Sequence, residues 1–333
     1  MQAEIDALRL NQTWTEVDLP AGKKAISSKW MFKVKLKADG SLEKYKAHLV
    51  VRGNTQKEGI DYTETFSPVV KMATIRTVLA LAAARQWPIY QLDVNNAFLY
   101  GDLHEEVCMK MPEGIPNPHS KVCKLQKSLY GLKQASRQWH SKLADFLRSQ
   151  GYSQSKSDYS LFIQLSSAHL TVVAVYVDDI LITGSDPTAI QQLKQNLHST
   201  FGIKDLDFLH YFLGFEVSRS PDGFTLTQRR FTQDLLKQSE HLHSKPTATP
   251  LPLNCKLLPT DGVPLPDPAE YRTYIGKLNF LSNTRPDISY AVQSLSQFMQ
   301  HPTTSHMAVL QHLLRYLSGT SGQGILLKGA DQL

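Results

Sequence analysis

Apolar and basic residues alternate from Phe32 to Lys37, a pattern typical of a strand with one buried and one cationic face. Asp39-Gly40 favours a tight turn, and the segment from Tyr45 to Arg52 supplies the returning strand. The sequence therefore predicts an antiparallel hairpin near the N-terminus. A plainer interpretation stays open at this point, namely a half-exposed hairpin whose lysines only keep one face soluble.

Further along the chain, helical and strand patterns succeed one another, as in an α+β protein. Helices are predicted at 74–87, 136–148, 187–201, 271–280, 288–299 and 306–317. Apolar runs rich in β-branched residues predict strands at 170–177 and 180–183, and further strands are predicted at 90–94 and 209–217. Seven prolines between Ser244 and Pro268 predict a Pro-rich linker at 244–268. A chain of 333 residues accommodates two or three domains, or one large catalytic core.

Positive charge gathers in and around the predicted hairpin. The whole chain carries a formal net charge of +6, whereas the segment from Pro20 to Lys57 holds ten Lys or Arg against two acids, a local excess of +8. Such a cluster favours an anionic partner, although a solvated basic surface explains the modest overall excess equally well. The composition, 41% hydrophobic and 20% charged, is that of a folded protein and argues against wholesale disorder.

The three cysteines include no C-x-x-C pair, which argues against a disulfide framework and indicates a reducing compartment. His104 and Cys108, and likewise His119 and Cys123, stand four residues apart, so a metal site is one hypothesis, with scattered loop residues as the favoured interpretation.

The first 30 residues contain no apolar signal region, and no apolar run approaches the ~18 residues that span a bilayer. We expect a soluble intracellular protein, cytoplasmic or nuclear or both, that is not secreted.

Two adjacent carboxylates, Asp178 and Asp179, interrupt an apolar run that predicts one strand before them and another after them. Like charges repel, and desolvating them is costly unless a cation or hydrogen-bond donors compensate. An exposed turn, where aspartate is common, is the alternative interpretation. Asp93 lies in a further predicted strand, and if the strands are sheet neighbours, three acids share one site. Hard oxygen ligands on rigid strands suit Mg²⁺, and two such ions can assist an in-line phosphoryl displacement.

Several ordered sequence boxes are similar to those of a known family. Tyr176-Val177-Asp178-Asp179 resembles the Tyr-x-Asp-Asp box of reverse transcriptases. Further boxes resemble those of copia-type LTR retrotransposon enzymes, namely Lys46 to Val50, Gly59 to Tyr62, Glu64 to Val69, Gln91 to Leu99, Ser128 to Gln134, Tyr211 to Gly214 and Thr284 to Asp287. The resemblance extends from Trp14 to about Leu327, which indicates the reverse transcriptase segment of a Pol polyprotein.

The resemblance implies an α+β, right-hand polymerase fold with fingers, palm and thumb, in which an antiparallel palm sheet carries the Tyr-x-Asp-Asp hairpin. The implied domains are an N-terminal segment at 1–19, fingers at 20–89 and 101–134, palm at 90–100 and 135–227, and thumb with a truncated C-terminal extension at 228–333. The palm part at 135–227 would include the catalytic hairpin and the primer grip. The chain ends about where the family's RNase H domain would begin.

The resemblance also assigns roles to single residues. Asp93, Asp178 and Asp179 would be catalytic and would hold two Mg²⁺ ions, or Mn²⁺ in their place, with the Val94 carbonyl as a backbone ligand. The nucleotide would be bound by Lys46, Asn96, Ala97, Phe98, Tyr130 and Gly131. Primer and template would be bound by Tyr176, Val177, Phe212, Leu213, Gly214, Arg272, Gly276 and Phe280.

Without the resemblance, plainer interpretations hold for several of these residues. Phe98 would be a core residue rather than a gate that excludes a ribose 2′-hydroxyl. The segment from Phe212 to Gly214 would be an apolar strand rather than a primer grip. Arg272, Gly276 and Phe280, which share one helix face, would form a helix-packing surface rather than the thumb surface that follows the duplex minor groove.

The chain departs from the family pattern at two places. His48 stands where the family usually has arginine, and Asp207-Phe208 replaces a glycine-containing turn. A neutral imidazole is a weaker phosphate ligand than a guanidinium.

The leading hypothesis is an RNA-directed DNA polymerase that uses two metal ions to transfer a nucleotide from a deoxynucleoside triphosphate to the 3′-hydroxyl of a DNA primer on an RNA template. No membrane partner is expected. One alternative is a catalytically impaired, transposon-derived remnant that only binds nucleic acid. The other is a reading frame that folds poorly or is not expressed.

Overall fold

The computed structural model describes residues 1–36, 41–166 and 169–328. The predicted turn at Asp39-Gly40 and the end of the predicted C-terminal extension, 329–333, lie outside the described residues. The chain forms two compact units. Unit 1 comprises Met1–Val78 and Trp87–Phe208, and unit 2 comprises Leu79–Gln86 and Leu209–Leu333. Helix α2 (Met72–Ala84) therefore contributes residues to both.

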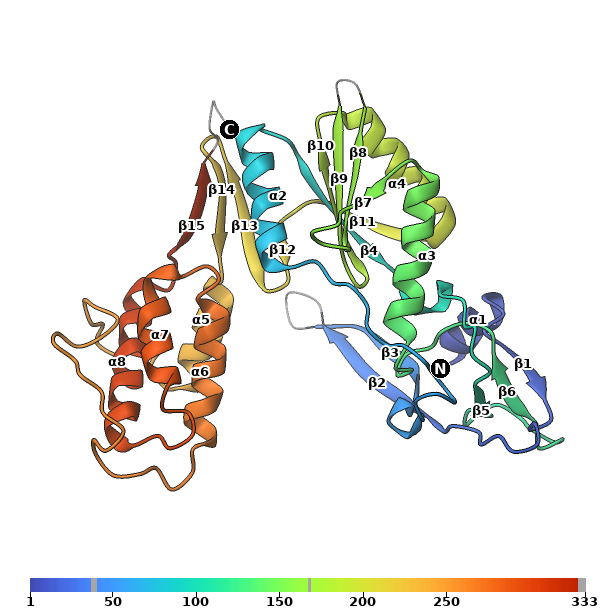
Figure 1. Ribbon diagram of the computed structural model, residues 1–333, viewed down its shortest axis with the longest axis horizontal. Helices are drawn as coiled ribbons and strands as arrows, with labels where there is room; N and C mark the ends of the chain where they lie inside the picture. Colours follow the sequence, from blue (N-terminus) through green and yellow to red (C-terminus); the bar gives the residue numbers. More distant parts are fainter. Residues whose placement is uncertain (37–40, 167–168, 329–333) are drawn as a thin grey trace. The chain divides into compact units, whose positions relative to one another are not determined.

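Unit 1 contains the sheet that carries the predicted catalytic strands (Figure 1). Within the described residues this sheet has six antiparallel strands in the order β11-β4-β10-β9-β8-β7. Their bounds are Ile203–Phe208 (β11), Ile89–Val94 (β4), Asp179–Gly184 (β10), Leu170–Tyr176 (β9), Leu161–Leu165 (β8) and Ser153–Gln154 (β7). The strands of Asp93 and Asp179, β4 and β10, are thus direct neighbours.

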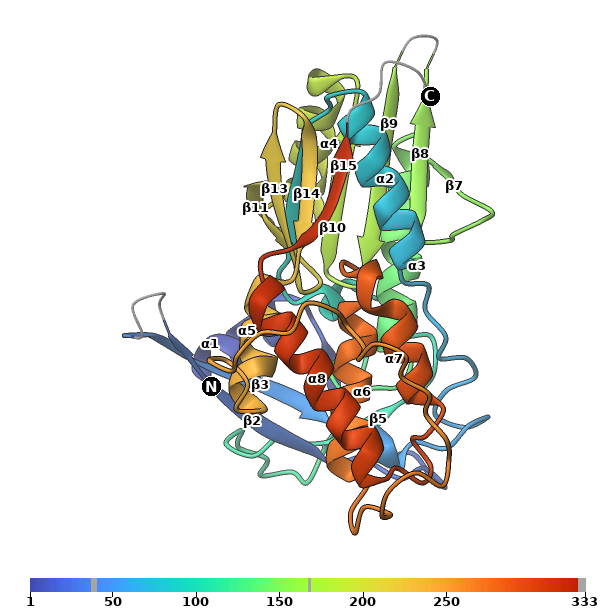
Figure 2. The ribbon, with the colours of Figure 1, turned by 90° about the vertical axis from the view of Figure 1, so that its left-hand side faces the viewer.

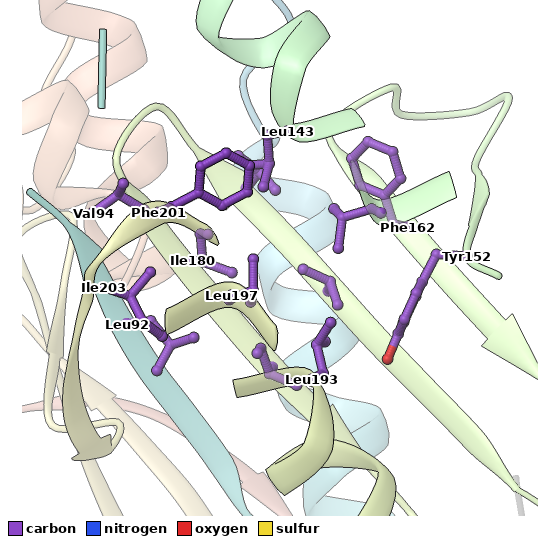
Figure 3. Packing of buried hydrophobic residues seen from close by; sticks show 14 of the residues in the cluster. Leu92, Val94, Leu143, Tyr152, Phe162, Ile180, Leu193, Leu197, Phe201 and Ile203 are labelled. Atoms are coloured by element: carbon purple, nitrogen blue, oxygen red, sulfur yellow. The ribbon is translucent and has the colours of Figure 1, made fainter. Parts of the chain in front are cut away.

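Helices α3 (Ala135–Ser149) and α4 (Pro187–Phe201) pack on one face of this sheet. Figure 3 shows Leu143 from α3, Leu197 from α4 and Ile180 from β10 meeting in the same core. Because side chains alternate along a strand, this face takes every second residue of β4 and β10. The residues between them lie on the opposite face, which is free of these two helices.

Local signals explain where α4 begins and ends. The Asp186 side chain accepts hydrogen bonds from the backbone N–H groups of Thr188 and Ala189, and Pro187 occupies the first turn, where its missing N–H costs nothing. At the other end Gly202 adopts the left-handed conformation, with φ 56°, that terminates many helices. The helix predicted at 187–201 is therefore confirmed at both ends.

The predicted basic hairpin is formed by β2 (Ser28–Leu36) and β3 (Leu42–Val51). At its base, Leu49 and Val51 join a core with α1 (Gln2–Leu10) and with the sheet of β1 (Trp14–Val17), β6 (Val122–Leu125) and β5 (Cys108–Lys110). Further out, Phe32 is 70% exposed and Val34 is 52% exposed. The prediction of a buried apolar face is wrong for this outer part, because the hairpin extends beyond the core that its base joins.

Unit 2 combines a small sheet with a helical core (Figure 2). The sheet has the order β12-β13-β14-β15, with bounds Tyr211–Phe212, Phe215–Ser220, Gly223–Thr227 and Gly324–Lys328. The helices are α5 (Arg229–Gln238), α6 (Ala269–Leu281), α7 (Ser289–Ser296) and α8 (Thr304–Thr320). Tyr271, Leu278 and Leu314 are buried between them, and the helices predicted after residue 270 are confirmed.

Two predictions for unit 2 are wrong. The strand predicted at 209–217 is two strands, β12 and β13, because Leu213 (φ 51°) and Gly214 (φ 87°) turn the chain between them.

The Pro-rich segment 244–268 does not behave as a linker, since it packs along α8 inside the unit. Thr247 Oγ1 donates to the His312 carbonyl oxygen at 3.2 Å, and the Leu265 N–H donates to the Pro302 carbonyl oxygen at 2.9 Å. Proline restricts the backbone there without excluding it from packing.

Candidate active site

The three aspartates predicted as metal ligands lie together, on the sheet face opposite α3 and α4. Leu92 and Val94 belong to the core, so Asp93 between them projects from the other face. Asp179 is the register partner of Asp93 on β10, and Asp178 lies in the turn that joins β9 to β10. The Val94 N–H donates to the Asp178 carbonyl oxygen at 2.9 Å, which holds this turn at the end of β4.

Burial and mutual repulsion both disfavour the charged forms of these carboxyl groups. Burial raises the pKa of Asp178, the charge of Asp93 raises it further, and the charge of Lys46 opposes both. Burial also raises the pKa of Asp179, and the neighbouring aspartates add to this. A hydrogen bond from Gln91 Nε2 to Asp179 Oδ1, at 3.2 Å, acts in the opposite direction. The site therefore holds more negative charge than its hydrogen bonds compensate.

The donor chemistry of this site fits a hard divalent cation. Carboxylate oxygens on rigid strands are the ligands that Mg²⁺ and Mn²⁺ prefer, and an ion would relieve the repulsion between them. In the part of the chain that the structure describes, no three or more His, Cys, Asp or Glu side chains are arranged to hold a metal ion. Metal binding would therefore require the three carboxylates to rotate toward a common point. The register of β4 and β10 already brings the backbone positions of Asp93 and Asp179 together.

Of the predicted nucleotide-binding residues that follow β4, Phe98 contacts Tyr130. Asn96 is left-handed (φ 53°) and begins the short 3-10 helix η2, Ala97–Tyr100, in which Ala97 is buried. This turn places the Phe98 ring edge to face with the Tyr130 ring, with 4.9 Å between centroids. Phe98 also packs against two of the hydrophobic clusters of unit 1, as the plainer interpretation of a packing residue expects. Burial raises the pKa of Tyr130, and the charges of Asp178 and other acids raise it further, to about 12. The Tyr130 hydroxyl is therefore protonated at neutral pH.

Tyr130 and Gly131 lie directly against the end of β3. The Val51 N–H donates to the Tyr130 carbonyl oxygen at 2.7 Å. At Gly131 (φ 93°) an added Cβ would lie 2.1 Å from the Val51 carbonyl oxygen, so no larger residue fits without moving the backbone. Gly131 also lines a cavity of about 480 Å³ together with Lys29 and Arg52. A positively charged cavity therefore adjoins the predicted nucleotide-binding box.

His48, the residue that departs from the family pattern, is half-buried between two groups. Its Nδ1 lies 3.3 Å from Glu4 Oε1 of α1, and its ring centroid lies 5.3 Å from that of Tyr130. Lys46, two residues earlier on the same face of β3, faces Lys33 across the hairpin. The cationic face of the hairpin thus continues into the surroundings of Tyr130 and Asp178.

The predicted primer grip and thumb helix contact each other within unit 2. Gly214 has φ 87°, and an added Cβ there would lie 3.2 Å from Phe280 Cζ, so the Phe280 ring lies close against the turn. Phe212 is buried, and Phe280 also packs edge to face with Phe231, 5.1 Å between centroids. These contacts bring together two boxes that the sequence separates by more than 60 residues.

The open face of α6 carries the other two residues of the predicted thumb surface. Nothing lies within 4 Å of the position that a Cβ would take at Gly276, so the helix is open there. The Arg272 side chain donates to the backbone carbonyl oxygens of Met299 and Gln300, at 2.7 and 3.2 Å. The plainer prediction of a helix-packing face is therefore wrong at Gly276, whereas Arg272 stabilises the end of a neighbouring helix region.

Sequence reasoning missed several residues around the carboxylates. Gln91 bonds Asp179, and its position two residues before Asp93 on the same strand face could have revealed it. Lys204 of β11 is the register partner of Asp93 on its other side. Trp139 donates from its indole Nε1 to the Val177 carbonyl oxygen at 2.7 Å. No sequence signal indicates these last two, because each depends on packing between distant segments.

The histidine and cysteine residues of the alternative metal hypothesis do not form a site. Cys108 and Cys123 are buried on neighbouring strands but are not register partners. Burial raises the pKa of the Cys123 thiol to about 12, and its Sγ contacts Met111 Sδ at 3.6 Å. His104 and His119 are exposed, as expected for scattered loop residues.

In the described part of the chain, no helix has both the length and the apolar character needed to cross a membrane.

Comparison with known proteins gives consistent matches. The family model described as reverse transcriptase (RNA-dependent DNA polymerase) matches residues 11–252. Over its full length the chain is 48% identical to the retrovirus-related Pol polyprotein from transposon RE1 of Arabidopsis thaliana and 41% identical to that from transposon TNT 1-94 of Nicotiana tabacum, of which it covers 23% and 26%. The chain thus spans about a quarter of the length of these relatives. A solved foamy viral protease-reverse transcriptase in complex with double-stranded DNA aligns over 97% of this chain and 48% of its own, with a TM-score of 0.47 and 13% identity.

Proposed function

Because the chain belongs to the reverse transcriptase family, in its copia-type branch, we propose that it is the RNA-directed DNA polymerase core of a retrotransposon Pol polyprotein. Membership confirms the α+β right-hand polymerase class expected from the sequence. The boundaries of fingers, palm and thumb stay a prediction, as does the intracellular location. The observation that carries the proposal is the register of β4 and β10, which supports a common site for Asp93, Asp178 and Asp179.

In the proposed reaction the primer 3′-hydroxyl oxygen attacks the α-phosphorus of a deoxynucleoside triphosphate, and the bond to the departing pyrophosphate breaks. Asp93, Asp178 and Asp179 would hold two divalent ions. Such ions, when bound, favour deprotonation of the hydroxyl and neutralise charge on the pyrophosphate. The positive charge of Lys46 acts to lower the pKa of Asp178, which supports a role for this lysine at the triphosphate. The Phe98 and Tyr130 rings offer an apolar surface for the deoxyribose.

The template and primer are proposed to contact the remaining boxes. The cationic face of the β2–β3 hairpin, with Lys29 and Arg52 at the adjoining cavity, supports contacts with template phosphates. The Leu213-Gly214 turn contacts Phe280 through Gly214 in unit 2, which supports a joint role in holding the primer. Gly276 leaves α6 open for the close approach of a duplex backbone.

Primer extension on an RNA template tests this proposal. The wild-type chain should incorporate deoxynucleotides in the presence of Mg²⁺, and Asp178→Asn should reduce the rate by about 10³-fold, the scale of losing a charge-stabilising group at a phosphoryl centre. Asp145→Asn is the matched control, because Asp145 is exposed and forms an ion pair with Arg148 on α3. Equal extension by wild type and Asp178→Asn would contradict the site.

The second candidate function is a nucleic-acid-binding remnant without catalysis. The observation in its favour is that the imidazole of His48, in place of the family's arginine, is engaged by Glu4. This candidate predicts salt-sensitive binding of template-primer, with no extension at any Mg²⁺ concentration.

A further inference from the structure

A hydrogen bond from the core of unit 1 reaches the turn between β9 and β10, which contains Val177 and Asp178. Trp139 of α3 is 1% exposed, and its indole Nε1–H donates to the Val177 carbonyl oxygen at 2.7 Å. The indole packs edge to face against Phe201 of α4, with 5.2 Å between centroids and an interplanar angle of 89°. The donor is therefore held by two helices, while the acceptor immediately precedes Asp178.

Val177 needs such a restraint because of its backbone conformation. Its φ is 54°, in the left-handed region that β-branched residues rarely adopt and in which they are strained. The next residue, Asp178, is held through its carbonyl oxygen by the Val94 N–H at 2.9 Å. The turn is thus fixed from two directions, by β4 through Asp178 and by α3 through Val177.

We propose that Trp139 is a positioning residue for nucleotide transfer. Its indole N–H holds Val177 in the left-handed conformation, and this conformation sets the direction in which Asp178 and Asp179 leave the turn. The kinetic part of the inference rests on the proposed polymerase function. The structural part, that the indole N–H restrains the turn, does not depend on activity.

Trp139→Phe tests the inference, because phenylalanine keeps an aromatic ring in the core and removes the donor. We expect kcat for primer extension to fall about tenfold, since small misplacement of reacting groups has effects of this order or larger. The KM for deoxynucleotide and the Kd for template-primer should change less than about twofold, because neither contact surface is altered. Amide hydrogen exchange at Val94 and in the turn should become at least about tenfold faster, with exchange in α6, which belongs to the separate core of unit 2, unchanged.

Tyr152→Phe is the matched control. Tyr152 lies in the same core as Trp139 and shares a hydrogen bond with Thr171, at the end of β9 remote from the turn. Its variant should lose a buried hydrogen bond without any change in kcat or in exchange at Val94. A loss of kcat in Tyr152→Phe equal to that in Trp139→Phe would show a general effect of core stability and would overturn the proposal.

Two further variants separate the hydrogen bond from ring packing. Replacing Trp139 with 3-benzothienylalanine preserves the bicyclic shape and removes only the N–H, so it should reproduce the Trp139→Phe effects in a fully folded protein. In a Val177→Gly background, Trp139→Phe should have little further effect on turn exchange, because glycine adopts φ 54° without strain. Wild-type exchange in the benzothienylalanine protein would overturn the proposal. If wild type extends no primer, the polymerase function fails, and the exchange measurements still decide the structural part.

Discussion

Asp93 and Asp179 lie directly opposite each other in the register of β4 and β10, so their side chains leave one sheet at the same place and on the same face. Directly opposed carboxylates destabilise a sheet unless a cation lies between or beside them. The opposed carboxylates therefore reduce the stability of the metal-free fold, and this cost is measurable.

Asp179→Asn should stabilise unit 1 in metal-free buffer while abolishing activity. The amide removes one charge from a group whose pKa is raised by burial and by the neighbouring aspartates. We expect a gain on the order of 1 kcal/mol, measured by urea denaturation with tryptophan fluorescence. All four tryptophans, Trp14, Trp30, Trp87 and Trp139, lie in unit 1, so the signal reports this unit.

Mg²⁺ provides the matching test of the same pair. It should raise the thermal midpoint of the wild-type chain and raise that of Asp179→Asn much less, because an ion that binds only the folded state stabilises it. Equal Mg²⁺ stabilisation of the two proteins would mean that the ion binds elsewhere.

His48→Arg should strengthen template-primer binding roughly threefold to tenfold at low salt, because a charge-assisted hydrogen bond to phosphate is stronger than one from a neutral imidazole. The slope of log Kd against log salt should become steeper by about one, as expected for one added phosphate contact. Fluorescence anisotropy with a labelled template-primer measures both. His48→Gln is the control without charge. An unchanged slope in His48→Arg would show that position 48 does not face the nucleic acid.

Asp207→Gly should stabilise unit 1 by about 0.5–1 kcal/mol, because Asp207 has φ 60° and glycine adopts this conformation without strain. The backbone N–H of residue 207, which donates to Asp205 Oδ1 at 3.0 Å, is retained. Urea denaturation measures the effect. Asp207→Ala removes the same carboxylate but keeps a Cβ, so it should give no gain. A gain of equal size in both variants would point to charge rather than to the backbone.

Gly276→Ala should separate stability from duplex binding in unit 2. Alanine in a helix interior is favoured over glycine by about 1 kcal/mol, and the added methyl group meets open space. Hydrogen exchange in α6 should therefore slow down. If this face approaches a duplex closely, affinity for template-primer should fall severalfold all the same. A more stable helix with unchanged affinity would exclude Gly276 from the nucleic-acid surface.

The pH dependence of unit 2 should reveal Asp287. Burial acts to raise the pKa of Asp287, but hydrogen bonds from Arg285 and Tyr316 outweigh it and lower the pKa below its usual range. Such a carboxylate stabilises the fold above its unfolded-state pKa of about 3.9, and the contribution is lost as the pH falls through the lower folded-state pKa. Hydrogen exchange in α8 should therefore accelerate in that acidic window. Asp287→Asn should be less protected at pH 7 and should lack this dependence.

Much of the candidate site was predictable because its signals are local. A box of four residues, Tyr176 to Asp179, between two apolar runs indicates a hairpin, and the segment from Tyr90 to Val94 indicates a further strand that contains Asp93. The limits of α4 follow from a cap, a proline and a glycine within two residues of its ends. Each of these signals is contained in a few consecutive residues.

Other features depend on which distant segments pack together. The exposure of Phe32 was not predictable, because alternation does not tell how far a hairpin extends beyond its core. The division of 209–217 into two strands depends on Leu213 adopting φ 51°, which its side chain does not favour and the surrounding contacts impose. The helix predicted from 136 to 148 gave no indication that Trp139 within it bonds Val177.

The sequence by itself determined the family, the identity of the three aspartates and the type of most long elements, because composition, periodicity and capping act over one or two turns or a single strand. Only the tertiary structure decided that Asp179 faces Asp93, that Gly214 meets Phe280 and that Trp139 restrains the turn before Asp178. These relationships join residues dozens of positions apart. Their geometry is set by strand register and core packing, which no local pattern encodes.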